Sequence, residues 1–224
     1  MMKKGVAVTV TFLILSVAGP ALATEGAGTS PVTVGIKAGT LGIGIGGQYR
    51  LNESFGLGLG ANYFKYDFDF TADDIDYSAE LTLVSATVLG HYYPMKGRFR
   101  LTGGLAFNGN EIDAQSKPEI GVEIGDTTYP GVRVGTIDGK IDFRTIAPYL
   151  GLGWGPSPEK RWGFTFDVGV LFQGSPKVDL TASGPITIVP GFQEDLAQEE
   201  QKVQDELEGF QYYPIIGLGL YYRF

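Results

Sequence analysis

The sequence predicts an all-β protein, an eight-stranded antiparallel up-and-down transmembrane β-barrel. Segments of about ten residues alternate large apolar residues with glycine or polar residues, and short turns alternate with long connections along the chain. The composition agrees, with 34 glycines and 12 tyrosines in 224 residues. Successive side chains of a strand point to opposite faces, so each segment gives one apolar face for lipid and one small or polar face for the lumen.

The last segment of the chain carries this alternation most clearly. Its large apolar residues are Ile216, Leu218, Leu220, Tyr222 and Phe224. The intervening residues are Gly217, Gly219, Tyr221 and Arg223. We therefore expect the chain to end in a membrane-spanning strand.

The same pattern predicts the other strands. In chain order they cover residues 32–38, 41–51, 55–63, 77–93, 98–108, 141–154 and 161–173. The segment 41–51 is expected to point Leu41, Ile43 and Ile45 outward. The segment 141–154 changes phase near Ile146, which suggests a β-bulge.

Connection lengths predict the orientation. The short turns at 52–54, 94–97 and 155–160 are rich in Gly, Pro, Asn and Ser, whereas the connections at 71–76, 114–136 and 181–209 are mostly longer. Bacterial barrels place short turns in the periplasm and long loops outside. If Phe224 lies at the periplasmic end, the short turns lie there too, and the strand count closes at eight.

The N-terminus has the pattern of a secretory signal peptide. Lys3 and Lys4 precede an apolar stretch from Val6 to Val17, and Ala21-Leu22-Ala23 fits an A-x-A cleavage site. The stretch is shorter than the ~20 apolar residues that a spanning helix needs. We expect residues 1–23 to be cleaved and residues 24–224 to form one barrel domain.

Charge and cysteine content exclude several classes of function. The chain has 17 basic and 25 acidic residues, and removal of Lys3 and Lys4 with the signal peptide makes it more acidic. This balance argues against a nucleic-acid partner, which requires a basic surface. The absence of cysteine excludes disulfides, thiolate metal sites and cysteine nucleophiles.

The lumen is expected to hold a polar network. In an eight-stranded barrel the interior is just filled by side chains, so a wide aqueous pore is not expected. Alternation places Arg50, Arg100, Asp167 and Arg223 inside. Buried charges must pair, so we expect arginine–carboxylate pairs across the lumen.

The last long connection predicts a short amphipathic helix. Phe192, Leu196, Val203 and Leu207 fall on one helical face, and Gly209 is a candidate C-cap. This face could line the entry of a small hydrophobic ligand, although an apolar helix stripe more often packs against its own protein.

Acidic residues cluster in the first and third long connections. The weak candidates for metal ligands are Asp73, Asp74, Asp76, Glu199 and Glu200. Their spacing does not match an EF-hand loop, so a solvated acidic surface is the favoured interpretation. No metal or other cofactor is predicted.

Two further motifs are better explained by structure than by chemistry. Residues 42–47 match G-x-G-x-x-G, but the motif requires a following helix, and here the glycines alternate within a strand. His91, the single histidine, is expected at the periplasmic rim within an aromatic girdle. No matching Ser-His or Asp-His arrangement accompanies it.

The signal peptide, the alternating strands and the terminal Tyr222-Arg223-Phe224 resemble the small outer-membrane β-barrel proteins of Gram-negative bacteria, the OmpW-like and OmpX-like group in the broad sense. This resemblance implies a location in the outer membrane. It also implies that the C-terminal aromatic residues, Tyr222 and Phe224, are an assembly signal for the barrel assembly machinery.

The resemblance is informative about location and not about activity. We expect a monomeric, non-enzymatic barrel with a structural or surface-interaction role, in contact with outer-membrane lipid, lipopolysaccharide and divalent cations. The alternatives are a barrel that binds or passes a small hydrophobic solute and, further from the pattern, a lipid-modifying barrel enzyme.

Overall fold

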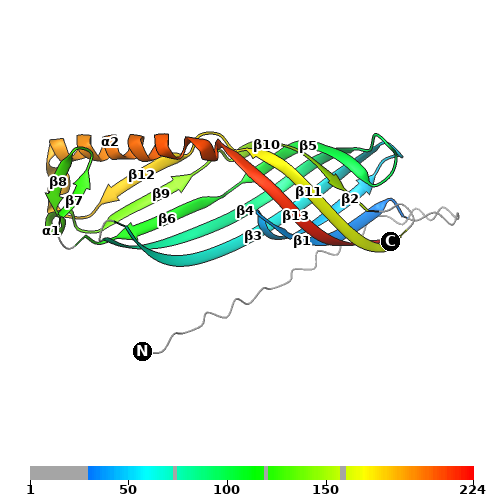
Figure 1. Cartoon of the computed structure of the whole chain (residues 1–224), viewed down its shortest axis with the longest axis horizontal. Helices are drawn as coiled ribbons and strands as arrows, with labels where there is room; N and C mark the ends of the chain where they lie inside the picture. The colour runs from blue at the N-terminus through cyan, green and yellow to red at the C-terminus, as the bar shows by residue number, and fades with distance from the viewer. Residues whose placement is uncertain (1–29, 73–74, 119–120, 157–159) are drawn as a thin grey trace, which may run out of the picture.

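The computed structural model describes residues 30–72, 75–118, 121–156 and 160–224. The predicted signal peptide and the candidates Asp73 and Asp74 lie outside these residues. The described chain forms a closed antiparallel barrel of eight strands (Figure 1). They are β1 (Val32–Gly39), β2 (Gly42–Arg50), β3 (Phe55–Ala72), β4 (Ile75–Tyr92), β5 (Phe99–Asn108), β10 (Ile146–Trp154), β11 (Trp162–Phe172) and β13 (Tyr212–Arg223). Pairing of β1 with β13 closes the ring, which confirms the predicted fold class.

The outward face of the barrel is apolar, as the alternation predicts. Ile43 and Phe164, for example, are 68% and 73% exposed. An apolar surface that extends around the whole barrel is unfavourable in water and favourable in the hydrocarbon of a membrane. Leu41 is the exception to the prediction, because it is buried inside the barrel at the turn between β1 and β2.

The short turns and both ends of the described chain lie at one end of the barrel. The Ser30 backbone N–H donates to the carbonyl of Phe224 over 2.8 Å. The turns β2–β3, β4–β5 and β10–β11 also lie at this end, which we call the short-turn end (Figure 1). The longer connections extend from the opposite, outer end.

The outer end carries a second structure that the sequence pattern did not predict. Strands β3 and β4 continue beyond the barrel, so the predicted strand 55–63 ends too early and the predicted loop 71–76 is mostly strand. The strands β6 (Glu111–Ser116), β9 (Ile137–Asp142) and β12 (Lys177–Ala182) pair in that order beside the outer half of β4. We call the five strands at this level the outer sheet.

The polarity of the two faces reverses along β3. The β3–β4 pairing keeps one register from Phe55↔Tyr92 to Ala72↔Ile75, so residues of equal parity share one face throughout. Outward residues are apolar up to Tyr63 and then charged from Lys65 onward. A lipid-facing surface must be apolar and a water-facing surface can be charged, so the reversal marks the membrane boundary.

The predicted strand 141–154 is two strands. β9 ends at Asp142 and β10 begins at Ile146. β9 pairs with β6 and β12 in the outer sheet, whereas β10 pairs with β5 and β11 in the barrel. The phase change near Ile146 is therefore a change of partners and not a bulge.

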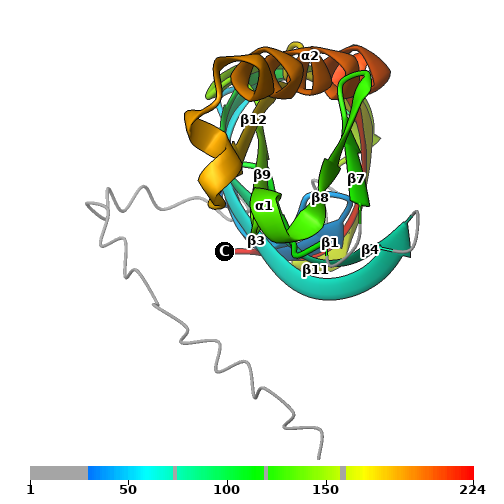
Figure 2. The ribbon, with the colours of Figure 1, turned by 90° about the vertical axis from the view of Figure 1, so that its left-hand side faces the viewer.

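Helix α2 (Pro190–Glu206) lies along the outer sheet beside β12 (Figure 2). The hairpin β7 (Gly121–Ile124)–β8 (Thr127–Pro130) contacts α2 at Asp195 and Glu199. The short helices are α1 (Gly131–Val134), η1 (Pro185–Ile188) and η2 (Glu208–Gln211). The predicted C-cap was wrong, because α2 is followed by Leu207 as C-cap and Gly209 lies in η2. In the described chain, none of the helices has the length and apolar character to cross a bilayer.

These outer elements share a small core of their own. We call this the outer core, and it consists of Val122, Ile124, Val134, Phe192 and Leu196, packed against Tyr129, Ile137, Leu180, Ala182 and Ile186. The described residues of the predicted connections 114–136 and 181–209 therefore form packed structure rather than open loops.

Candidate functional site

The lumen of the barrel contains a cluster of buried apolar side chains near its outer end. We call this group the plug, and it consists of Leu41, Ala106, Ala147, Tyr149, Leu171 and Ile215, with Leu89 and Tyr213 packed against it. Above the plug, the Asn108 amide donates to Gln173 Oε1 and the Gln173 amide donates to the carbonyl of Phe210. The plug residues come from β4, β5, β10, β11, β13 and the β1–β2 turn, so this apolar cluster joins five of the eight strands inside the barrel.

Below the plug, Arg100 of β5 crosses the lumen. Its Nη2 donates to both carboxylate oxygens of Asp167 on β11, over 2.7 and 3.0 Å, and its Nη1 donates to Gln48 Oε1 on β2 over 3.3 Å. The Arg100 side chain is 2% exposed. β5 and β2 are not neighbours in the ring, so this bridge fills the middle of the lumen.

The other two arginines of the predicted network lie at the short-turn end. Arg50 donates to the carbonyls of Glu53 and Lys96 over 2.7 and 2.9 Å, and its guanidinium lies 4.1 Å from the centre of the Tyr93 ring. Arg50 therefore ties two turns together instead of meeting a carboxylate. Arg223 is buried at the same end, on the last strand.

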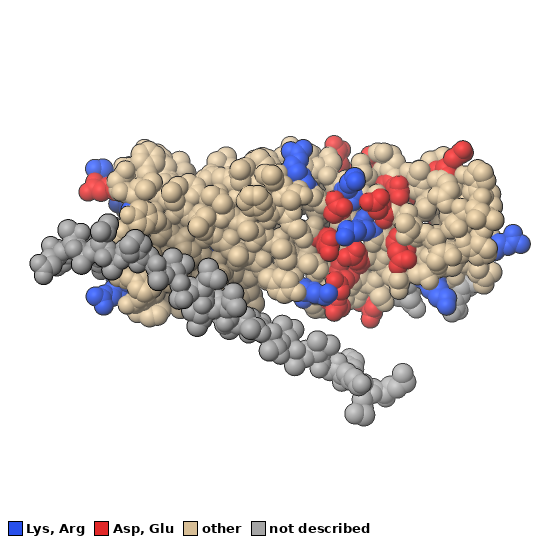
Figure 3. Space-filling view, turned by 180° about the vertical axis from the view of Figure 1, so that it is seen from behind, with Lys and Arg blue, Asp and Glu red and all other residues tan. Residues whose placement is uncertain are grey.

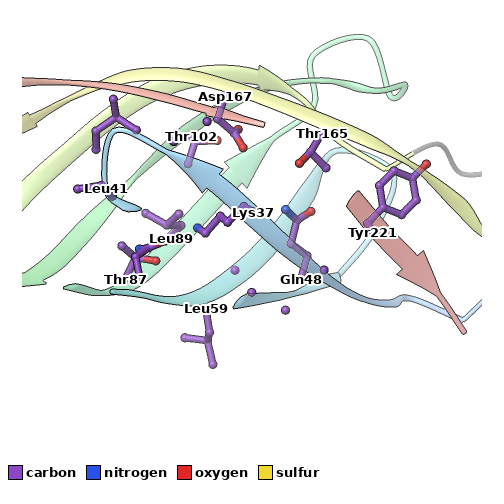
Figure 4. Close-up of a pocket in the computed structure, with 18 of the residues that line it drawn as sticks. Lys37, Leu41, Gln48, Leu59, Thr87, Leu89, Thr102, Thr165, Asp167 and Tyr221 are labelled. Carbon is purple, nitrogen blue, oxygen red and sulfur yellow. The ribbon is translucent and has the colours of Figure 1, made fainter. Parts of the chain in front are cut away.

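A cavity of about 110 Å³ lies between the plug and the short-turn end. Its lining includes His91 and also Lys37, Gln48, Thr87 and Asp167, which are labelled in Figure 4. Lys37 and Thr87 were not among the predicted site residues. Strand parity places Lys37 inside the barrel, because its neighbour Ile36 faces outward in β1. The predicted strand 32–38 is too short for the alternation to show this clearly.

His91 faces the lumen rather than the aromatic girdle. It is buried, and its Nδ1 lies 3.0 Å from the hydroxyl of Thr102. Parity explains the difference: Tyr92 is on the lipid face, so His91 must be on the other. No hydrogen bond or ion pair between His91 and a carboxylate is found in the described residues, and residues 42–47 lie within β2 with no helix after them.

The outer face of the outer sheet carries a charged ladder. Cross-strand partners form rows across all five strands, and one row runs Asp67–Glu80–Asp113–Lys140–Asp179. The members of the ladder are Lys65, Asp67, Asp69, Glu80, Glu111, Asp113, Asp138, Lys140, Asp142, Lys177 and Asp179. Figure 3 shows acidic and basic side chains gathered in a band beside the largely uncharged wall of the barrel.

The ladder is mostly acidic and partly internally paired. Lys65 Nζ lies 2.6 Å from Glu80 and Lys140 Nζ lies 2.8 Å from Glu111. The hydrogen bond from Lys65 holds the pKa of Glu80 below its usual range. A groove of about 670 Å³ runs along the ladder. This face is a water-exposed surface suited to polar or ionic contacts.

Of the candidate metal ligands, only Glu199 and Glu200 have described side chains, and each accepts a backbone hydrogen bond. Glu199 accepts a hydrogen bond from the Gly125 backbone N–H and Glu200 accepts one from the Leu180 backbone N–H, so both tie α2 to its neighbours. The side chain of Asp76 lies outside the described residues. In the part of the chain that the structure describes, no three acidic or histidine side chains are arranged to hold one metal ion.

The predicted apolar face of the helix is only half buried. Phe192 and Leu196 lie in the outer core, whereas Val203 and Leu207 remain partly exposed. The Phe192 ring packs edge-to-face on Tyr129, with 5.1 Å between centroids. The Asp195 carboxylate accepts a hydrogen bond from Tyr129 and raises the pKa of Tyr129 above its ordinary value. This face is therefore used mainly for packing.

An aromatic row runs along the inner face of β3 beyond the barrel. Phe64, Tyr66 and Phe68 stack with centroid separations of 6.3 and 6.0 Å. Tyr66 is 56% exposed. In the outer sheet β3 is an edge strand, so the row has a partner strand on one side only.

The C-terminal aromatic residues lie on the lipid face at the short-turn end. The Tyr222 ring lies 4.7 Å from Trp162 and 5.1 Å from Phe224, centroid to centroid. Phe224 follows the last strand and remains exposed. They form an accessible aromatic end to β13.

No protein-family model and no curated protein sequence matches this chain. The crystal structure of Acinetobacter baumannii CarO2 matches 88% of this chain and 99% of its own, with 23% identity and a TM-score of 0.60. The crystal structure of Acinetobacter baumannii CarO matches 87% of this chain and 98% of its own, with 22% identity and a TM-score of 0.57. These likenesses show a shared fold, which is that of the small outer-membrane β-barrels.

Proposed function

Taking the chain as an eight-stranded outer-membrane β-barrel, we propose that it is a non-conducting, non-enzymatic anchor that presents the outer sheet at the cell surface. The observation that carries the proposal is the closed lumen, with the plug above and the Arg100–Asp167 bridge below. Because side chains fill the barrel at two levels, we expect partners to contact the outer sheet and not the lumen.

The proposal includes the biogenesis and partners expected from the sequence. Residues 1–23 direct export and are removed, and Tyr222 and Phe224 are presented to the barrel assembly machinery. At the surface, the partners are outer-membrane lipid and lipopolysaccharide. Divalent cations would link lipid phosphates to the acidic side chains of the charged ladder, since hard cations favour carboxylate oxygen.

Single-channel recording tests the closed lumen. Refolded wild-type protein in a planar bilayer should give no discrete conductance steps, because the plug leaves no continuous water-filled path. A large porin in the same bilayer provides the control for detection, and a heat-modifiable gel band shows that the sample is folded. Discrete steps from folded protein would contradict the proposal.

A second candidate function, binding of a small hydrophobic solute, is favoured by the aromatic row. The exposed Tyr66 ring and its stacked neighbours offer an apolar contact surface above the membrane boundary. The apolar face of α2 is less suitable for this role, because Phe192 and Leu196 are already buried in the outer core.

Calorimetric titration of the protein in lipid nanodiscs with a medium-chain fatty acid tests this second function. Tyr66→Ser should weaken binding about fivefold, because it removes one aromatic contact. Tyr63→Ser is the matched control, since Tyr63 is similarly exposed on the opposite face of the same strand. Equal affinities for all three proteins, or no binding above empty nanodiscs, would reject the idea.

A further inference from the structure

The lumen cavity contains polar groups that the Arg100–Asp167 bridge leaves unused. Lys37 forms no ion pair within the described chain. Thr87 Oγ1 and His91 Nε2 are buried and make no hydrogen bond with any described residue. The residues Lys37, Thr87 and His91 all line the same cavity.

These groups meet at one stretch of the barrel wall. A Cβ placed on Gly60 of β3 would lie 2.8 Å from Thr87 Oγ1 and 3.1 Å from Lys37 Nζ, and one on Gly58 would lie 2.5 Å from His91 Nε2. In Figure 4 the Lys37 side chain extends toward Thr87 and Leu89, with Thr102 and Asp167 on its other side. Because β3 has glycines here, Lys37 of β1 and two side chains of β4 have room to face one small ligand.

The chemistry of the three groups favours an anion. The Lys37 ammonium and the Thr87 hydroxyl are donors, and His91 Nε2–H is a donor when the Thr102 hydroxyl donates to Nδ1. Lys37 and Arg100 bring two positive charges to this level of the lumen, and the one carboxylate there, Asp167, is already bonded to Arg100. Lys37 is only partly exposed, and a charge that is partly withdrawn from water without a counter-ion is stabilised by an anion beside it.

We propose that the lumen cavity is a binding site for one small monovalent anion, held by Lys37 Nζ, Thr87 Oγ1 and His91 Nε2. The volume of about 110 Å³ accommodates a halide with a few water molecules, or a small carboxylate. The plug lies on the outer side of the cavity, and several of its members line it. The anion would therefore be a resident component of the folded barrel, independent of any role of the outer sheet.

Thermal unfolding of refolded protein in sodium chloride, acetate and gluconate at equal ionic strength tests the site. A ligand that binds only the folded state raises the midpoint, so the wild type should melt about 5 °C higher in chloride than in gluconate. The acetate sample shows whether the site prefers a halide or a carboxylate.

Lys37→Met should remove the difference in melting midpoint between the salts, whereas Lys177→Met, a change at an exposed lysine, should retain it. Thr87→Val should raise the chloride concentration for half the effect about tenfold.

Crystals of the wild type grown in bromide give a second measurement that depends on no variant. An anomalous peak beside Lys37 Nζ within the barrel supports the site. Equal midpoints for the wild type in all three salts, or no bromide peak in the lumen, would overturn it. Loss of the salt effect in Lys177→Met as well as in Lys37→Met would also overturn it, because the effect would then be a general one on surface charge.

Discussion

Arg100→Met is expected to lower the free energy of unfolding by about 3 kcal/mol, the largest effect of any single lumen substitution. Methionine keeps most of the volume of arginine but leaves the Asp167 carboxylate without its two hydrogen bonds inside the barrel. Removal of Arg100 is costly because the Asp167 carboxylate, which is only 25% exposed, then remains inside the barrel without its partner. Urea unfolding of the refolded protein in lipid vesicles measures the change.

Two further variants separate this mechanism from a general loss of charge. Arg161→Met is the matched control, since Arg161 is exposed and should be replaceable with little change. The double variant Arg100→Met with Asp167→Leu should recover much of the lost stability, because no unpaired charge is left. A loss below about 1 kcal/mol in Arg100→Met would show that the bridge acts as an exposed pair.

Phe192→Ala is expected to unfold the outer core while leaving the barrel folded. Phe192 is 0% exposed and is the largest member of a core with few residues. A buried Phe→Ala change costs about 3–5 kcal/mol, which is a large share of what so small a core can supply. Hydrogen exchange should become fast in α2 and in the hairpin β7–β8, with the barrel strands still protected.

The barrel should survive because its hydrogen bonds do not depend on the outer core. Its strands pair around a closed ring, and heat-modifiable migration of the folded protein should therefore be retained. Phe210→Ala provides the control, because Phe210 lies in η2 and is 55% exposed. Slow exchange in α2 of Phe192→Ala would show that the outer core is not the main source of its order.

The sequence was sufficient to predict the barrel, because lipid imposes the same alternation on every strand. Exposed residues such as Ile43 and Phe164 must be apolar and their neighbours small or polar. The prediction failed where that rule changes. At Lys65 the alternation continues but the faces exchange polarity, so the predicted strand 55–63 stops at the membrane boundary and does not reach Asp67.

The outer sheet could not be predicted for a different reason. β6, β9 and β12 are short, and each finds its partner far along the chain, as in the pairing of Glu111 with Asp142. Local alternation contains no information about such partners. The change of phase near Ile146 was the one visible sign, and it marked the step from the outer sheet to the barrel.

The lumen was predicted in part. Arg100 and Asp167 follow from strand parity and from the need to pair buried charges, and the structure brings them together. Arg50 follows the same parity but uses carbonyls of nearby turns, which parity alone does not reveal. Lys37 and His91 were not predicted as lumen groups. The predicted strand around Lys37 is short, and two tyrosines follow His91 in the sequence.

The β3–β4 hairpin has a mechanical consequence. Each strand has 18 residues, which at about 3.3 Å per residue gives a ribbon of roughly 60 Å, about twice the thickness of the hydrocarbon layer. Its hydrogen-bond ladder has one register from the short-turn end to the outer tip. The β3–β4 ribbon therefore transmits a force on the outer sheet directly to the barrel wall. Such a force should tilt the barrel in the bilayer.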